Sequence, residues 1–289
     1  MSTGPGTVSK ILWHFTGGPL WDSAKNHQCT TLKPASDAYK AFTGILGSKQ
    51  IRLGGYRELV NIQIHRSEKR GDDPESLYLT PHVESLMSDP VCCLAEIPIS
   101  HLSHHSSRYG NMAIGFHREK VVRTRHFAPV HYRLQGQVDM QWLWHAVDNL
   151  KKADKLAVSD TIERMRSQLP LLSTQIADAD SGALALLDEL EGQLTLLKYH
   201  HGFARTALYE TLCWIKSFTE DEFTDIYAER EWRSNRAYDF ACNHLAMLVL
   251  PREREGVRYF DDFVAVSSEE PFSIPRSVPI VPWEDLIEH

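Results

Sequence analysis

The first 135 residues alternate between short apolar runs and turn-forming residues. Residues 11–15, 90–99, 112–116 and 130–134 carry apolar side chains in short runs close to glycine or proline, so we predict four strands there. Residues 36–47 place apolar side chains at helical spacing after a Ser-Asp cap, which predicts one helix. The first part of the chain is therefore expected to be strand-rich.

The pattern changes in the middle of the chain. A charged stretch over residues 65–76 is rich in turn formers and is predicted to be a solvated loop. Beyond it, apolar residues recur every three or four positions over residues 139–157, 182–199 and 204–218, which predicts helices. The leucine stripes of these helices are expected to be core positions.

Sequence patterns typical of strands return near the end of the chain. Residues 225–233, 245–250 and 263–266 are short segments with turn signals between them, and residues 283–289 are predicted to be a short helix. The order along the chain is thus strand-rich, helical and strand-rich.

This order is best explained by a single α+β domain. Neither strand-rich part has enough strands to fold alone. We therefore predict that residues 1–138 and 221–289 form one core and that residues 139–220 are an inserted helical block.

Composition and charge narrow the class of protein. Hydrophobic residues make up 42% and charged residues 24% of the chain, which is typical of a globular protein. The net charge of −7 gives no general attraction for nucleic acid or anionic membranes. The five cysteines include no C-x-x-C pair, and no run of 18 apolar residues occurs. We expect a cytoplasmic protein with reduced thiols and no membrane partner.

His14 is the first candidate for a functional role. It lies between two aromatic residues of the first predicted strand and is followed by Thr16, Gly17 and Gly18. A histidine in this setting can point into a cleft, and glycines beside it let a ligand approach the backbone. The alternative is a core histidine whose ring is satisfied by a backbone carbonyl.

Tyr109 is the second candidate. It precedes Gly110 at the entrance of a predicted strand, where its ring can stack on a base or a nicotinamide. The alternative is an ordinary aromatic residue beside a turn.

Glu229 and Glu231 form the third candidate. They stand two residues apart, so on a strand both side chains face the same side. Neighbouring carboxylates raise each other's pKa, and one of them can act as a base or stabilise a cation. The alternative is a pair of charges on a solvated strand face.

A basic stretch and the histidines complete the candidates. Arg118, Arg123 and Arg125 lie in the densest basic stretch, which can grip phosphates or can simply be a solvated loop. The histidines lack carboxylates or cysteines at ligand spacing, so no metal is expected. G-x-G-x-x-G and P-loop motifs are absent, which argues against those nucleotide-binding folds.

An ordered set of short motifs resembles a known family. The set includes Trp13 to Gly18, Ile51 to Leu53, Cys93 to Pro98, Tyr109-Gly110 with Gly115-Phe116, and Glu229 to Arg233. Together these motifs resemble the AbiGi-type abortive-infection family of bacterial phage-defence proteins, over most of the chain outside residues 139–220.

The same order is similar to that of ADP-ribosyltransferases, and this resemblance implies a split antiparallel sheet core. It also implies a site for NAD, which serves as a substrate. His14 would hold the adenosine ribose next to Thr16 and Gly17, and Tyr109 or Tyr132 would stack on nicotinamide.

The resemblance also implies roles for the two glutamates. Glu231 would stabilise the ribosyl oxocarbenium ion as nicotinamide leaves. Glu229 would orient the incoming nucleophile.

We therefore expect a phage-defence protein that moves ADP-ribose from NAD to a nucleic-acid or protein acceptor. Arg118, Arg123 and Arg125 are the candidate contacts to substrate phosphates. The alternative is a non-catalytic antitoxin that restrains a toxin partner through the inserted helices. A nuclease that uses the histidine-rich loop is a third possibility, for which no second acid–base partner is evident.

Overall fold

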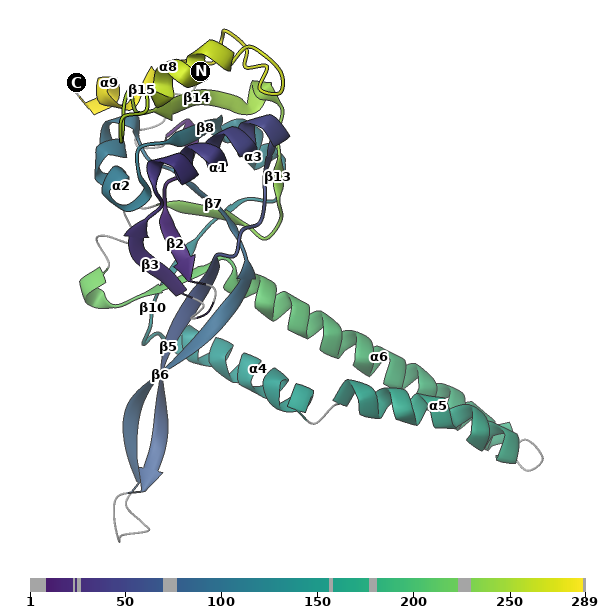
Figure 1. Ribbon diagram of the computed structural model, residues 1–289. Helices are drawn as coiled ribbons and strands as arrows, with labels where there is room; N and C mark the ends of the chain where they lie inside the picture. The colour runs from purple at the N-terminus through teal and green to yellow at the C-terminus, as the bar shows by residue number, and fades with distance from the viewer. Residues whose placement is uncertain are drawn as a thin grey trace, which may run out of the picture. The chain divides into compact units, whose positions relative to one another are not determined.

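The computed structural model describes residues 9–22, 24, 27–69, 77–155, 158–176, 181–222 and 230–287 (Figure 1). The chain forms two compact units. The sheet unit comprises Met1–Val60, Met87–Leu134 and Cys213–His289, and the helical unit comprises Asn61–Leu86 and Gln135–Leu212. The mixed α/β character predicted from the sequence is confirmed.

A seven-stranded sheet is the framework of the sheet unit. Its strand order is β15-β14-β8-β1-β7-β12-β9, and neighbouring strands are antiparallel except β14 and β15, which run parallel. The strands are β1 (Ile11–Phe15), β7 (Cys92–Ala95), β8 (Ala113–His117), β9 (Ala128–Pro129), β12 (Glu231–Ser234), β14 (Leu245–Leu250) and β15 (Ile280–Pro282).

Both faces of this sheet are covered, because successive side chains of a strand point to opposite sides. In β1, Leu12 packs into one core with Phe42 of helix α1 (Ala35–Ser48) and Phe263 of helix α8 (Tyr259–Val266). Trp13 packs into a second core with Trp283 and donates a hydrogen bond from its indole nitrogen to the Ile97 carbonyl, 3.0 Å away.

The second core is covered by helices α2 (Leu102–Tyr109) and α9 (Trp283–Ile287). Shorter elements complete the sheet unit. They are the hairpin β2 (Pro19–Asp22) and β3 (His27–Leu32), the pairs β4 (Gln50–Ile51) with β13 (Tyr238–Asp239) and β10 (His131–Leu134) with β11 (Ile215–Phe218), helix α3 (Arg118–Arg123), and 3-10 turns at Ile99–His101, Glu220–Glu222 and Cys242–His244.

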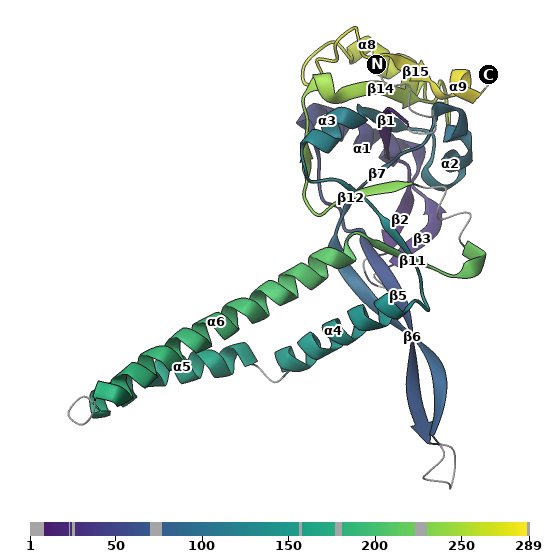
Figure 2. The ribbon, with the colours of Figure 1, turned by 180° about the vertical axis from the view of Figure 1, so that it is seen from behind.

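The helical unit contains three helices, α4 (Val138–Lys155), α5 (Val158–Ile176) and α6 (Ser181–Leu212), among its described residues. It also contains most of the hairpin formed by β5 (Arg57–Lys69) and β6 (Leu77–Pro90). Helices α5 and α6 lie side by side in both views (Figure 1 and Figure 2), where Ile162 and Leu169 pack against Leu194. No described helix has the length and apolarity to cross a membrane.

Several predicted elements are corrected by the structure. Residues 263–266 belong to helix α8 rather than to a strand, because Tyr259 and Phe263 bury one helical face. The helices predicted over residues 182–199 and 204–218 are one helix, α6, followed by strand β11. The predicted loop over residues 65–76 begins within β5, which continues to Lys69. Helix α5 was not predicted.

We predict that Gly115 cannot carry a side chain without loss of stability. A Cβ atom there would lie 2.8 Å from Ile11 Cγ2, 2.9 Å from the Trp13 ring and 3.2 Å from the Met247 carbonyl oxygen. Gly115→Ala should therefore lower the free energy of unfolding by about 1–3 kcal/mol through overpacking. Urea denaturation measures the change. The matched control is Gly44→Ala in α1, where an added Cβ meets nothing within 4 Å. Equal effects of the two substitutions would contradict the prediction.

Candidate functional site

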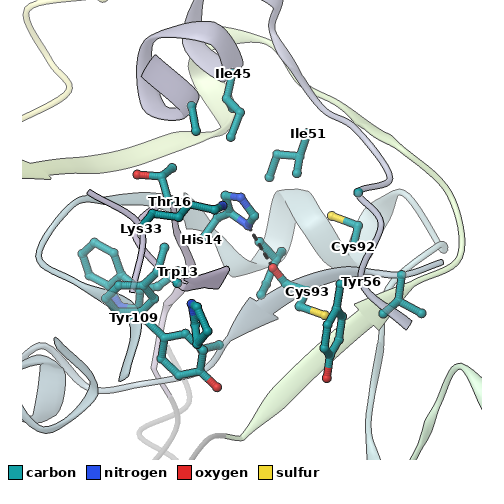
Figure 3. Close-up of a pocket in the computed structure, with 18 of the residues that line it drawn as sticks. Trp13, His14, Thr16, Lys33, Ile45, Ile51, Tyr56, Cys92, Cys93 and Tyr109 are labelled. Atoms are coloured by element: carbon teal, nitrogen blue, oxygen red, sulfur yellow. Dashed lines mark hydrogen bonds between the residues drawn. The ribbon is translucent and has the colours of Figure 1, made fainter. Parts of the chain in front are cut away.

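The sheet unit contains a cavity of about 900 Å³, within the size range of small-molecule sites (Figure 3). Segments far apart in the sequence line it, including β1, hairpin β2–β3, α1, β7 and the end of α2. Four of the residues singled out from the sequence lie in its wall, namely His14, Thr16, Tyr109 and Glu231.

His14 contacts both the protein backbone and the cavity. Its Nδ1 atom lies 3.0 Å from the Cys93 carbonyl oxygen, which can only accept a hydrogen bond. Nδ1 therefore carries the proton. Burial lowers the pKa of His14, the bond to Cys93 opposes this, and the positive charge of Lys33 lowers the pKa further. In a neutral ring of this tautomer, Nε2 is a hydrogen-bond acceptor.

Thr16 and Gly17 play different parts at the end of β1. Thr16 is 2% exposed and lines the cavity, and its hydroxyl has no hydrogen-bond partner among the described residues. Gly17 is not part of this wall. A Cβ atom at Gly17 would lie 3.0 Å from the Tyr109 carbonyl oxygen, so this glycine allows close contact with the end of α2.

Tyr109, and not Tyr132, faces the cavity. The Tyr109 ring lies 5.8 Å from the Phe15 ring, between ring centroids, in a tilted arrangement. The Tyr132 hydroxyl instead accepts a hydrogen bond from the backbone N–H of Glu231, at 2.9 Å, and Tyr132 is not among the residues that line the cavity.

Glu231 begins strand β12 and is held by cationic side chains. Arg233, two residues along, points to the same side of the strand and donates to both carboxylate oxygens of Glu231, at 2.9 and 2.8 Å. Lys216 lies 3.3 Å from Glu231 Oε2, and the Cys93 thiol also bonds the carboxylate. Glu229, the second predicted glutamate, lies outside the described residues.

Arg233 is fully buried, yet each of its five N–H groups has an acceptor. Besides Glu231, the guanidinium donates to Glu58 Oε2 at 2.5 Å and to the carbonyl oxygens of Cys213 and Ile215, both at 3.2 Å. Glu58 accepts a further bond from the Tyr56 hydroxyl at 2.6 Å. A buried charge is tolerated when it is paired and fully hydrogen-bonded in this way.

The Arg233 cluster, which we define as Arg233, Glu231, Glu58 and Lys216, fixes the charge of Glu231. Burial alone would raise the pKa of Glu231, but the positive charges of Arg233 and Lys216 outweigh it and hold this pKa well below its usual range. Glu231 is therefore a fixed negative charge in the cavity wall. Burial and the neighbouring carboxylate raise the pKa of the Cys93 thiol, so Cys93 stays protonated.

The arginines of the predicted basic stretch lie elsewhere. Arg118 is not among the residues that line the cavity; its guanidinium carbon stacks 5.2 Å from the Trp232 ring, and its Nε lies 3.7 Å from Glu96 Oε1. Arg123 and Arg125 are exposed at the end of α3 and just after it. The structure does not bring these three residues to the cavity.

The sequence analysis gave no role to Arg233, Lys33, Lys216 or Glu58. Arg233 lies in the same motif as Glu231. Their spacing of two residues in a strand places both side chains on one side, and this spacing could have indicated the ion pair. Lys33 also lines the cavity, but it lies in a short connection after β3 and carries no pattern of its own.

The fold and the cavity define a mixed α/β protein with a ligand-sized site on a mostly antiparallel sheet. The chain belongs to the AbiGi family, described as "Putative abortive phage resistance protein AbiGi, antitoxin", whose model matches residues 70–254. The resemblance stated from the sequence motifs is thereby confirmed. The matched range includes Tyr109 and Glu231 but begins after His14 and Thr16. No curated protein and no solved structure gives a significant match.

We predict that the Arg233 cluster is essential to the stability of the sheet unit. Arg233→Met would leave the buried carboxylates of Glu58 and Glu231 without their main partner and should cost about 3–5 kcal/mol of unfolding free energy. Urea denaturation measures this loss. Arg236→Met, at an exposed position three residues along, is the control and should change stability little. An Arg233→Met protein as stable as the parent would show that the prediction is wrong.

Proposed function

We propose that this AbiGi-family protein acts in abortive phage infection by binding NAD in the cavity and transferring its ADP-ribose to an acceptor. The observation that carries the proposal is that His14, Tyr109 and Glu231, from three distant segments, lie in the wall of one cavity. The ADP-ribosyltransferase resemblance implies that a histidine, an aromatic residue and a glutamate bind or act on NAD, and these three residues are the ones that match.

Each residue offers a group suited to its proposed role. His14 presents Nε2 as an acceptor for a ribose hydroxyl, because Nδ1 is committed to Cys93. Tyr109 offers a ring face on which a planar nicotinamide can stack. Glu231 supplies a carboxylate that remains ionised and does not need to move a proton.

The chemistry matches a fixed carboxylate. When the bond between the ribose carbon and the nicotinamide nitrogen breaks, the electron pair leaves with nicotinamide and positive charge develops on the ribose. Glu231 stabilises that charge, and Arg233 fixes the orientation of the carboxylate beforehand. The acceptor nucleophile then bonds the ribose carbon and loses its proton to the surroundings.

The acceptor is a nucleic acid or a protein. The exposed Arg123 and Arg125 are retained as candidate contacts to a nucleic-acid acceptor, because they lie outside the cavity and face solvent.

We predict that purified protein transfers label from NAD labelled in its adenosine part to a cellular acceptor. Glu231→Gln keeps the size of the side chain and one carbonyl oxygen for Arg233, and it should lower the transfer rate about 10²- to 10³-fold. Separate pools of RNA, DNA and protein identify the acceptor class. Glu253→Gln, which changes an exposed carboxyl, is the control and should transfer at the parental rate. Thermal unfolding establishes that both variants are folded.

Two outcomes would overturn the enzymatic proposal. One is the absence of both transfer and NAD binding, as measured by calorimetry, in the parent protein. The other is transfer by Glu231→Gln at the parental rate.

A second candidate function is that of an antitoxin that restrains a toxin partner. Two observations favour it: the description of the family names an antitoxin, and the helical unit exposes large apolar side chains. The most exposed of these include Trp142, Leu171, Leu186, Tyr199 and Phe203. Large apolar side chains exposed on helices are candidates for contacts with a protein partner.

We predict that the two candidate functions give different growth phenotypes when variants are tested in uninfected cells that carry the whole defence system. If the protein is an antitoxin, the double variant Leu186→Ser and Phe203→Ser should stop growth without phage, because the toxin is released. If it is a transferase, Glu231→Gln should abolish protection against phage and leave uninfected growth unchanged. Growth curves with and without phage measure both effects. Normal growth of the double variant would argue against restraint through these helices.

A further inference from the structure

The charge of the cavity wall differs in sign from that of the whole chain. The chain carries a net charge of −7, but its described cavity-lining residues include four cations, Lys33, Arg52, Arg108 and Lys216, against the single carboxylate of Glu231. Lys216 is paired with that carboxylate. The positive charge of Lys33 and Arg52, which form no ion pair among the described residues, favours an anionic ligand.

Lys33 is a cavity-lining cation that lies next to the His14 side chain (Figure 3). It follows β3, where its backbone N–H donates to the Gly18 carbonyl oxygen at 3.2 Å. Its side chain runs toward the His14 ring (Figure 3), and its charge acts on the pKa of that histidine. Burial lowers the pKa of Lys33, and the nearby Asp37 opposes this shift. No ion pair of Lys33 is found among the described residues.

Thr16 supplies an independent observation at the same place. Its hydroxyl is buried in the cavity wall two residues after His14 and has no hydrogen-bond partner among the residues that the structure describes. Buried hydroxyls are nearly always hydrogen-bonded in a folded protein. The Thr16 oxygen has almost no accessible surface, so its side chain has to rotate toward the cavity to reach a ligand. In that rotamer a ligand with acceptor oxygens would satisfy both this hydroxyl and the Lys33 ammonium group.

We propose that Lys33 and Thr16 form a phosphate subsite of the cavity, which binds the diphosphate group of a nucleotide. The proposal rests on the proposed function, in which the ligand is the dinucleotide NAD. A phosphate oxygen accepts from the Lys33 ammonium group and from the Thr16 hydroxyl, and such charge-assisted hydrogen bonds are among the strongest that a protein makes. His14 beside them contacts the adjoining ribose.

The test compares ADP with adenosine, which differ only in the diphosphate group, by calorimetry on the full chain. Lys33→Met keeps an unbranched side chain without its charge. It should weaken ADP binding about 10- to 100-fold and leave adenosine binding unchanged. Thr16→Val removes only the unpartnered hydroxyl and should also weaken ADP binding without lowering the melting temperature. Lys40→Met, at an exposed position of α1, is the control and should bind ADP as the parent does.

The outcomes separate this proposal from the proposed function. If Lys33→Met binds ADP and NAD as tightly as the parent, the phosphate subsite is wrong while the NAD site stands. If the parent binds ADP and inorganic pyrophosphate but not NAD, the subsite stands and NAD is not the ligand. If the parent binds none of the three, both proposals are wrong.

Discussion

The buried guanidinium of Arg233 is the interaction on which the sheet unit depends. It joins strand β12 to Glu58 and to the backbone of Cys213 and Ile215, so three segments distant in sequence share one set of hydrogen bonds. A buried cation is costly unless every donor is used. The positions of the groups around Arg233 are therefore tightly constrained. Glu231 accepts two of these hydrogen bonds, so the orientation of its carboxylate is constrained as well.

This constraint gives the cavity two kinds of wall. On one side, Glu231 is ionised and held in place by Arg233 and Lys216. On the other, Lys33 and Thr16 have polar groups that no described residue occupies. The hydrogen bonds of the first wall are made within the protein, whereas the Thr16 hydroxyl of the second has no partner among the described residues. This contrast is what supports the proposal that the cavity binds a ligand.

The sequence predicted the parts of the fold that depend on local patterns. Strands β1 and β14 follow from apolar runs and helix α1 from its helical apolar spacing, and the structure has them at nearly the predicted bounds. The predicted Ser-Asp cap of α1 is wrong, because the helix is preceded by Pro34 and has no side-chain cap hydrogen bond. Helix α8 was missed because four consecutive apolar or small residues, 263–266, look like a strand when Tyr259 is not considered with them. Helix α6 was divided in two because polar histidines and Gly202 interrupt its apolar spacing.

Some members of the candidate site were predicted, but their interactions were not. His14, Tyr109 and Glu231 were identified as individual residues with chemistry suited to a site. The partners of Arg233 could not be predicted, because Glu58 and the Cys213 carbonyl come from segments that only the folded chain brings together. Arg118 shows that a basic stretch alone does not identify a phosphate contact. Its side chain instead contacts Glu96 and Trp232.

The position of β1 in the sheet order has a consequence for how the chain can be divided. β1 lies between β8 and β7, yet it precedes residue 70, where the family match begins. A fragment restricted to the matched range would lose this internal strand and leave β8 and β7 with unpaired edges, which are templates for aggregation. Residues 70–254 of this chain are therefore not expected to fold on their own.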